Sequence, residues 1–194
     1  ILSMSTPDGV QSIKECIAMG ADNGYLASDR AYGGSDTLAT GYILSSCIKH
    51  IGEFDVIFTG TQAIDGDTGQ VGPEVAELLG YSQITYVREV EAYEDKVIAY
   101  RDSNNGIEKV ESSYPVVLTI SREAQEPRKT PFALLYDGIQ VSVFKFRADD
   151  ELIKVVHIGL QVLTVVEFHC FFADNRSQCI DRIRQGNEFV SHNV

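Results

Sequence analysis

Apolar positions in the first eighty residues follow two different periods in turn. Short, almost continuous apolar runs at 25–27 and 54–58 have the length of buried strands. Apolar residues at helical spacing accompany Asp8, Asp36 and Pro73, which are residue types that favour the start of a helix. Because strands and helices alternate, we expect an α/β fold whose strands are mostly parallel.

The pattern changes after Gly80. Alternating polar and apolar residues at 83–90 and 96–101 indicate antiparallel strands, and Asn104-Asn105-Gly106 is a strong hairpin signal. The apolar run 116–120 then predicts a further buried strand. An antiparallel excursion therefore interrupts the alternation of strands and helices.

The last third of the chain has a different character. Pro127, Pro131 and the pair Asp137-Gly138 are turn signals, which favour an arm over another strand and helix unit. We therefore expect an α/β domain over 1–121 and a C-terminal arm over 122–194. The expected fold class is α/β, with a mostly parallel sheet, helices on both faces, an antiparallel hairpin excursion and this arm.

Composition narrows the classes of function. The chain has 194 residues, of which 44% are hydrophobic, and its 16 basic and 28 acidic residues give a net charge of -12. That charge repels nucleic acids and anionic membranes. The apolar run 162–166 is far shorter than the roughly 20 residues of a membrane helix, so no membrane span is expected. The four cysteines lack CxxC spacing, which argues against a zinc site and favours a reducing compartment.

The segment between the strand at 54–58 and the helix at Pro73 is the strongest candidate for chemistry. It reads QAIDGDTGQVGP from Gln62 onward, and its glycines let the backbone approach a ligand closely. If the N–H groups of 66–71 turn inward before the helix, they and the helix dipole form a phosphate site, with the Thr68 hydroxyl as a further donor. Because neither a Walker loop nor GxGxxG is present, a plain glycine-rich turn is the alternative interpretation.

Other polar residues near this segment each allow two interpretations of their role. Asp65 and Asp67 have the spacing of paired carboxylates for acid/base chemistry or a hard metal, but we favour turn and ribose hydrogen bonds because further oxygen ligands are lacking. Ser35, Asp36 and Thr37 either line the same crevice or only cap a helix. The histidines are scattered and no Ser-His-Asp order stands out, so we predict no catalytic residue and no metal site.

Four ordered blocks of sequence carry a family resemblance. They are AMGAD at 18–22, SDRA at 28–31, SDTLAT at 35–40 and QAIDGDTGQVGP at 62–73. Together they resemble the electron transfer flavoprotein beta (small) subunit, and similarity continues to about residue 130. The resemblance implies a Rossmann-like nucleotide-binding domain, and it implies that the first strand of the family domain lies before Ile1.

The resemblance also implies site residues. The nucleotide-binding positions it implies are Gly66, Asp67, Thr68, Gly69, Gln70 and Val71, with Asp36, Thr37 and Thr40 as the neighbouring wall. Family members further use a segment near Glu-Pro-Arg to recognise partner dehydrogenases. The matching residues here are Ala124, in the place of an apolar anchor, and Glu126, Pro127 and Arg128.

The function implied by the resemblance is electron transfer rather than catalysis. Such a subunit pairs with an electron transfer flavoprotein alpha subunit that makes most contacts to FAD, and it carries electrons from dehydrogenases to an acceptor. It binds AMP itself, or a second FAD in electron-bifurcating members. The location implied is the cytoplasm in bacteria and the mitochondrial matrix in eukaryotes. The alternatives from the residues alone are a nucleotide-sensing α/β module without flavin and an adenylate-transferring ligase, for which the chain lacks recognisable pyrophosphate-handling residues.

Overall fold

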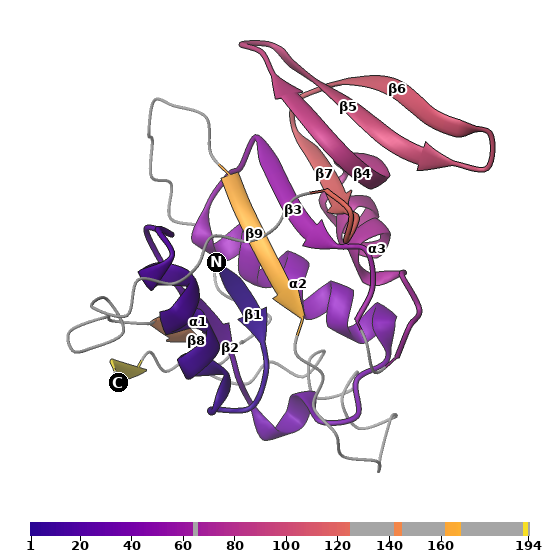
Figure 1. Ribbon diagram of the computed structural model, residues 1–194. Helices are drawn as coiled ribbons and strands as arrows, with labels where there is room; N and C mark the ends of the chain where they lie inside the picture. Colours follow the sequence, from indigo (N-terminus) through magenta and orange to yellow (C-terminus); the bar gives the residue numbers. More distant parts are fainter. Residues whose placement is uncertain (64–65, 125–141, 145–161, 168–191, 194) are drawn as a thin grey trace.

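The computed structural model describes residues 1–63, 66–124, 142–144, 162–167 and 192–193 (Figure 1). Its helices and strands are, in chain order, β1 (Leu2–Met4), α1 (Gly9–Ala18), β2 (Tyr25–Ala27), the short 3-10 helix η1 (Arg30–Tyr32), α2 (Thr37–Ile51), β3 (Val56–Gly60), α3 (Val71–Leu79), β4 (Ser82–Ala92), β5 (Lys96–Ser103), β6 (Gly106–Ser113), β7 (Val116–Ile120), β8 (Ser142–Phe144), β9 (Val162–Glu167) and β10 (His192–Asn193).

One mixed sheet organises the molecule. Its strand order is β10-β8-β2-β1-β9-β3-β7-β4-β5-β6. Neighbouring strands are parallel from β8 to β4, and the pairs β10-β8, β4-β5 and β5-β6 are antiparallel. The α/β class expected from the sequence is confirmed, and so is the antiparallel excursion over β4, β5 and β6.

The strand β9 lies in the interior of this sheet although it comes late in the chain. It pairs in parallel with β1 on one side, where Leu2 lies opposite Val165, and with β3 on the other, where Val56 lies opposite Val162. Only an arm is expected here from the sequence, because a short, mostly apolar run does not reveal which strands it joins. The boundary at residue 121 stays a prediction, but strands beyond it belong to the same sheet.

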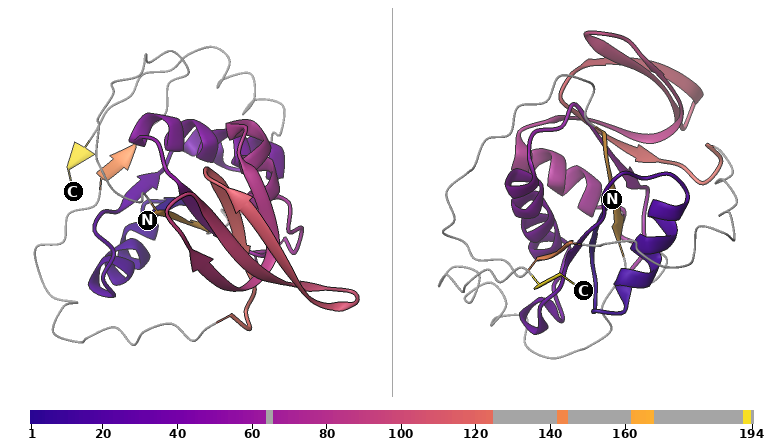
Figure 2. Two further views of the ribbon diagram at one scale, coloured as in Figure 1. Left: turned by 90° about the horizontal axis from the view of Figure 1, so that it is seen from above. Right: turned by 90° about the vertical axis from the view of Figure 1, so that its left-hand side faces the viewer.

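Helices cover both faces of the sheet (Figure 2). On β2, Ala27 belongs to one buried cluster with Leu44 of α2 and Val75 of α3. The preceding residue, Leu26, packs against Ile13 of α1 in a separate cluster. Because successive strand residues point to opposite faces, α1 lies on the face opposite to α2 and α3.

The antiparallel strands cover the second face of β3 and β7. Val97 and Ala99 of β5 form a buried cluster with Val56 of β3 and Leu118 of β7. On the other face of β3, Ile57 packs in the cluster that contains α2 and α3. β3 is thus packed on both of its faces before the loop that follows it.

Most predicted helix ends are confirmed. The Asp36 carboxylate accepts the Ala39 N–H at 2.9 Å and caps α2, and Gly80 ends α3 in the left-handed conformation. The predicted cap at Asp8 is wrong: its side chain makes no capping hydrogen bond, and its backbone is already helical at φ -65 and ψ -20. A residue with helical backbone angles lacks the extended geometry that aims a side chain at the next turn.

Two further sequence expectations concern membrane spans and the cysteines. Among the described helices, none is long and apolar enough to cross a membrane. Cys47 of α2 is a free, buried thiol, and burial raises its pKa to about 12. The side chain therefore stays protonated over the whole neutral range and packs as a small hydrophobe.

Candidate functional site

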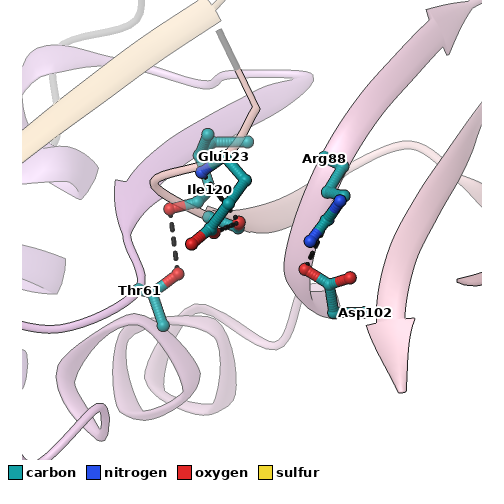
Figure 3. A network of polar contacts seen from close by, with 6 residues as sticks. Thr61, Arg88, Asp102, Ile120 and Glu123 are labelled. Atoms are coloured by element: carbon teal, nitrogen blue, oxygen red, sulfur yellow. Dashed lines mark hydrogen bonds and ion pairs between the residues drawn. The ribbon is translucent and has the colours of Figure 1, made fainter. Parts of the chain in front are cut away.

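The glycine-rich segment begins where two parallel strands end together. The last residue of β3, Gly60, lies opposite the last residue of β7, Ile120. One residue further, the Thr61 hydroxyl donates to the Ile120 carbonyl oxygen at 2.9 Å (Figure 3). The loop from 61 to 70 therefore leaves the sheet at the carboxyl ends of its strands, where open α/β sheets bind ligands.

Local hydrogen bonds shape the described part of this loop. Asp67 and Gly69 both have left-handed backbone angles, with φ of 53° and 62°. The Asp67 N–H donates to the Ala63 carbonyl oxygen at 3.0 Å, and Gln62 Nε2 donates to Asp67 Oδ1 at 2.6 Å. The Asp67 carboxylate is therefore held against Gln62. Asp65, the other candidate carboxylate, lies outside the described residues.

The start of α3 supplies unpaired backbone donors. Within the described part of the chain, no acceptor is found for the N–H groups of Gly69, Gln70 and Val71, and no side chain caps the helix at Gln70. Gly69 is partly exposed and Gln70 is exposed. These donors, together with the positive end of the α3 dipole, form the chemical environment that an anion prefers.

A glycine lets α3 begin directly against the sheet. A Cβ added to Gly72 would lie 2.6 Å from Thr59 Oγ1 and 2.8 Å from Thr119 Cγ2, both shorter than real side-chain contacts. Thr59 is buried and its hydroxyl has no hydrogen-bond partner in the described structure. The missing side chain at Gly72 therefore sets the distance between the helix start and the ends of β3 and β7.

The start of α2 lies beside the start of α3. Thr37 Oγ1 lies 3.1 Å from Gln70 Oε1 and 3.1 Å from Glu74 Oε1, so the structure brings Thr37 to the predicted loop. Asp36 faces its own helix as a cap, and Thr40 is buried within α2. The sequence analysis missed Glu74, whose Oε2 is buried without a partner among the described residues. A glutamate in the first turn of a helix is commonly explained by its favourable interaction with the positive end of the helix dipole. No sequence signal therefore marked Glu74 as a residue of the site.

The predicted partner segment starts from a tight turn after β7. Ser121 N–H donates to the Val87 carbonyl oxygen at 2.8 Å, and Ala124 N–H donates to the Ser121 carbonyl oxygen at 3.2 Å. Ser121 Oγ donates to Glu123 Oε2 at 2.5 Å and accepts the Glu123 N–H at 3.2 Å. Ala124 lies at the end of this turn, whereas Glu126, Pro127 and Arg128 fall outside the described residues. A serine hydroxyl that accepts the backbone N–H two residues on forms an ST turn, so Ser121 is a residue type that could have indicated the turn from the sequence.

A second polar contact lies close to this turn. Arg88 Nε on β4 forms an ion pair with Asp102 Oδ2 on β5 at 2.7 Å, near Glu123 (Figure 3). Both side chains are substantially exposed, so water weakens this pair and its contribution to stability is small. It orients the two side chains more than it stabilises the fold.

The Glu123 carboxyl provides a test of the turn. The pKa of this carboxyl lies below its ordinary value of 4.5. The main cause is the hydrogen bond that Ser121 donates to it, and the second is a hydrogen bond from its own backbone N–H. Because a lowered pKa favours the charged form in the folded state, the contribution of this carboxylate to the stability of the fold is present above the ordinary pKa and is lost as the pH falls through the lowered one.

We expect Ser121→Ala to raise the pKa of Glu123 toward 4.5. Carbon NMR of the Glu123 carboxyl measures it, and Ser112→Ala, far from the turn, is the control that should leave it unchanged.

Over the described ranges, no three His, Cys, Asp or Glu side chains come close enough to hold a metal ion. The described arrangement is a backbone cradle formed by the N–H groups of Gly69, Gln70 and Val71, beside Thr37, whose hydroxyl already contacts Gln70 and Glu74. Such a cradle recognises an anionic group by hydrogen bonds and by the dipole.

Comparison with known proteins shows the family of the chain. A family model described as "Electron transfer flavoprotein domain" matches residues 1–138. The chain belongs to the electron transfer flavoprotein beta-subunit family. "Electron transfer flavoprotein subunit beta" of Clostridium acetobutylicum is 40% identical over 161 residues, covering 83% of this chain and 62% of that protein. The Megasphaera elsdenii protein of the same name is 46% identical over 134 residues, covering 66% of this chain and 50% of that protein.

A relative with a more specific name shows the same pattern. "Caffeyl-CoA reductase-Etf complex subunit CarD" of Acetobacterium woodii is 34% identical over 171 residues, covering 88% of this chain and 65% of that protein. The chain thus spans between half and two thirds of the length of these curated relatives. Their names describe subunits of electron transfer complexes, and the family resemblance expected from the four sequence blocks is confirmed.

Proposed function

We propose that this chain acts as an electron transfer flavoprotein beta subunit. In this role it pairs with an alpha subunit, and the pair carries electrons through FAD from dehydrogenases to an acceptor. The beta subunit itself binds AMP or a second FAD. It acts as a carrier rather than an enzyme, in the cytoplasm of a bacterium or in the mitochondrial matrix of a eukaryote, on a Rossmann-like domain. Family membership over residues 1–138 supports this proposal.

The unpaired donors at the start of α3 are the observation on which nucleotide binding rests. The N–H groups of Gly69, Gln70 and Val71 would hold the phosphate, because they are aligned by the helix and lack acceptors among the described residues. Gly66, Asp67 and Thr68 are exposed and would shape the rim of the same loop. Thr37, which contacts Gln70, would border the nucleotide, with Asp36 and Thr40 behind it.

A partner-binding role for the turn after β7 completes the proposal. Ala124 would begin the segment that contacts dehydrogenases, followed by Glu126, Pro127 and Arg128. A single alanine offers one methyl group, whose burial yields only about 1 kcal/mol, so neighbouring residues would have to supply most of the contact.

Co-expression tests the whole proposal. The protein produced with an electron transfer flavoprotein alpha subunit should purify as a yellow heterodimer. On denaturation it should release FAD together with AMP, or FAD in twofold excess over the beta subunit. A stable but colourless complex without adenine nucleotide would contradict the proposal. Nucleotide released without flavin would instead favour a nucleotide-sensing module that uses the same loop.

A further inference from the structure

Two segments with separate proposed roles meet at one hydrogen bond. The nucleotide loop leaves the sheet at Thr61, and the partner segment leaves it after Ile120. The Thr61 hydroxyl donates to the Ile120 carbonyl oxygen at 2.9 Å, one residue beyond the last pair of the β3-β7 ladder (Figure 3). Because the bond lies outside the ladder, it depends on a side chain rather than on the sheet.

On the nucleotide side, the Thr61 carbonyl oxygen lies close to Gly69, whose N–H is proposed to hold the phosphate. A Cβ added to Gly69 would lie 3.5 Å from the Thr61 carbonyl oxygen and 3.9 Å from Gln62 Oε1. Gln62 in turn donates to Asp67 Oδ1 at 2.6 Å. A ligand that draws the amide of Gly69 toward itself therefore acts on a loop that passes close to the Thr61 carbonyl oxygen and is held to Gln62 through Asp67.

On the partner side, the acceptor of this hydrogen bond is adjacent to the turn. Ile120 precedes Ser121, which donates to the Val87 carbonyl oxygen on β4 at 2.8 Å. The turn is thus held from one side by β4 and from the other by Thr61. Its last described residue, Ala124, donates back to the Ser121 carbonyl oxygen.

We propose that Thr61 is a positioning residue whose hydrogen bond to Ile120 couples nucleotide binding at Gly69–Val71 to the order of the turn from Ser121 to Ala124. Nucleotide in the loop fixes Thr61, Thr61 fixes the carbonyl of Ile120, and the turn from Ser121 to Ala124 is thereby held in one conformation. By thermodynamic linkage, binding of a partner protein at this segment tightens nucleotide binding by the same factor. This inference rests on the proposed function, since it assumes nucleotide in this loop.

Hydrogen exchange with AMP as the probe tests the coupling. In the co-expressed heterodimer, stripped of AMP, we expect saturating AMP to slow exchange in peptides that cover 118–124 by about fivefold, the lower end of common coupling factors. Thr61→Val keeps the size of the side chain and removes its donor, so it should bind AMP without slowing this exchange. Thr61→Ser, which keeps the hydroxyl, should restore the effect. Thr85→Val is the matched control, because it removes a hydroxyl that contacts Arg101 on the neighbouring strand and should leave the effect intact.

Each outcome separates the coupling from the proposed function. If AMP binds to the wild-type protein without slowing exchange at 118–124, or if Thr61→Val shows the same slowing as the wild type, the role of Thr61 is refuted while the proposed function stands. If the wild-type heterodimer binds no adenine nucleotide at all, the proposed function fails, and the coupling fails with it.

Discussion

Replacing Gly69 by aspartate should weaken nucleotide retention. The new carboxylate would sit among the N–H groups proposed to hold the phosphate, and two unit charges about 4 Å apart repel by roughly 1 kcal/mol in water and 4 kcal/mol near a protein surface. We therefore expect AMP affinity to fall between about fivefold and several hundredfold. Isothermal titration of the heterodimer with AMP measures this change.

Asparagine at the same position is the matched control for Gly69. The position has φ of 62°, and aspartate and asparagine tolerate this conformation about equally well among residues with a side chain. A Cβ there would meet only ordinary contacts, the nearest at 3.5 Å. Gly69→Asn should therefore reproduce the steric and backbone effects without the charge. If both variants bind AMP as the wild type does, the phosphate does not lie at the start of α3.

Adding one methyl group at Gly72 should destabilise the fold. In Gly72→Ala the new Cβ would lie 2.6 Å from Thr59 Oγ1 and 2.8 Å from Thr119 Cγ2, so α3 or the strand ends must shift. Overpacking of this kind costs about 1 to 3 kcal/mol, which lowers the midpoint of thermal unfolding by roughly 2 to 12 °C in a chain of this size. Calorimetry or circular dichroism measures the midpoint.

Two further variants decide whether that close contact is the cause. Gly60→Ala is the control, because a Cβ at Gly60 meets nothing within 4 Å. Thr59→Ala together with Thr119→Ser removes both obstructing atoms and keeps the Thr119 oxygen that accepts the Tyr86 N–H. Gly72→Ala should cost much less in that background. Equal destabilisation by Gly60→Ala and Gly72→Ala would show that α3 moves away freely.

The elements whose position depends on local sequence could be predicted. Asp36 caps its helix, Gly80 ends the next one, and the run at 116–120 forms β7, because capping, left-handed termination and burial each leave a mark within a few residues. The glycine-rich segment also lies, as expected, between a buried strand and a proline-containing helix start. Its residues as nucleotide ligands remain a prediction.

Features that depend on contacts between residues far apart along the chain could not be predicted from the sequence. The place of β9 follows from pairing with β1 and β3, which no local pattern encodes. The bond from Thr61 to Ile120 joins residues 59 positions apart. Tyr86 adopts a left-handed φ of 59° although it is aromatic. It lies where the pairing of β4 with β7 shifts register between Ile84 and Val87, and its N–H donates to Thr119 Oγ1 at 3.0 Å. Long-range contacts of this kind compensate for unfavourable local conformations.

The interior place of β9 has a consequence for the order of folding on the ribosome. β1 and β3 flank a gap in the sheet that is filled by a strand starting about a hundred residues after β3 ends. At typical translation rates of about 5 to 20 residues per second, this gap stays open for roughly 5 to 20 seconds. During that interval the nascent chain exposes two strand edges inside its future core, and edges of this kind pair readily with other chains. We therefore expect the newborn protein to depend on chaperones until β9 has emerged.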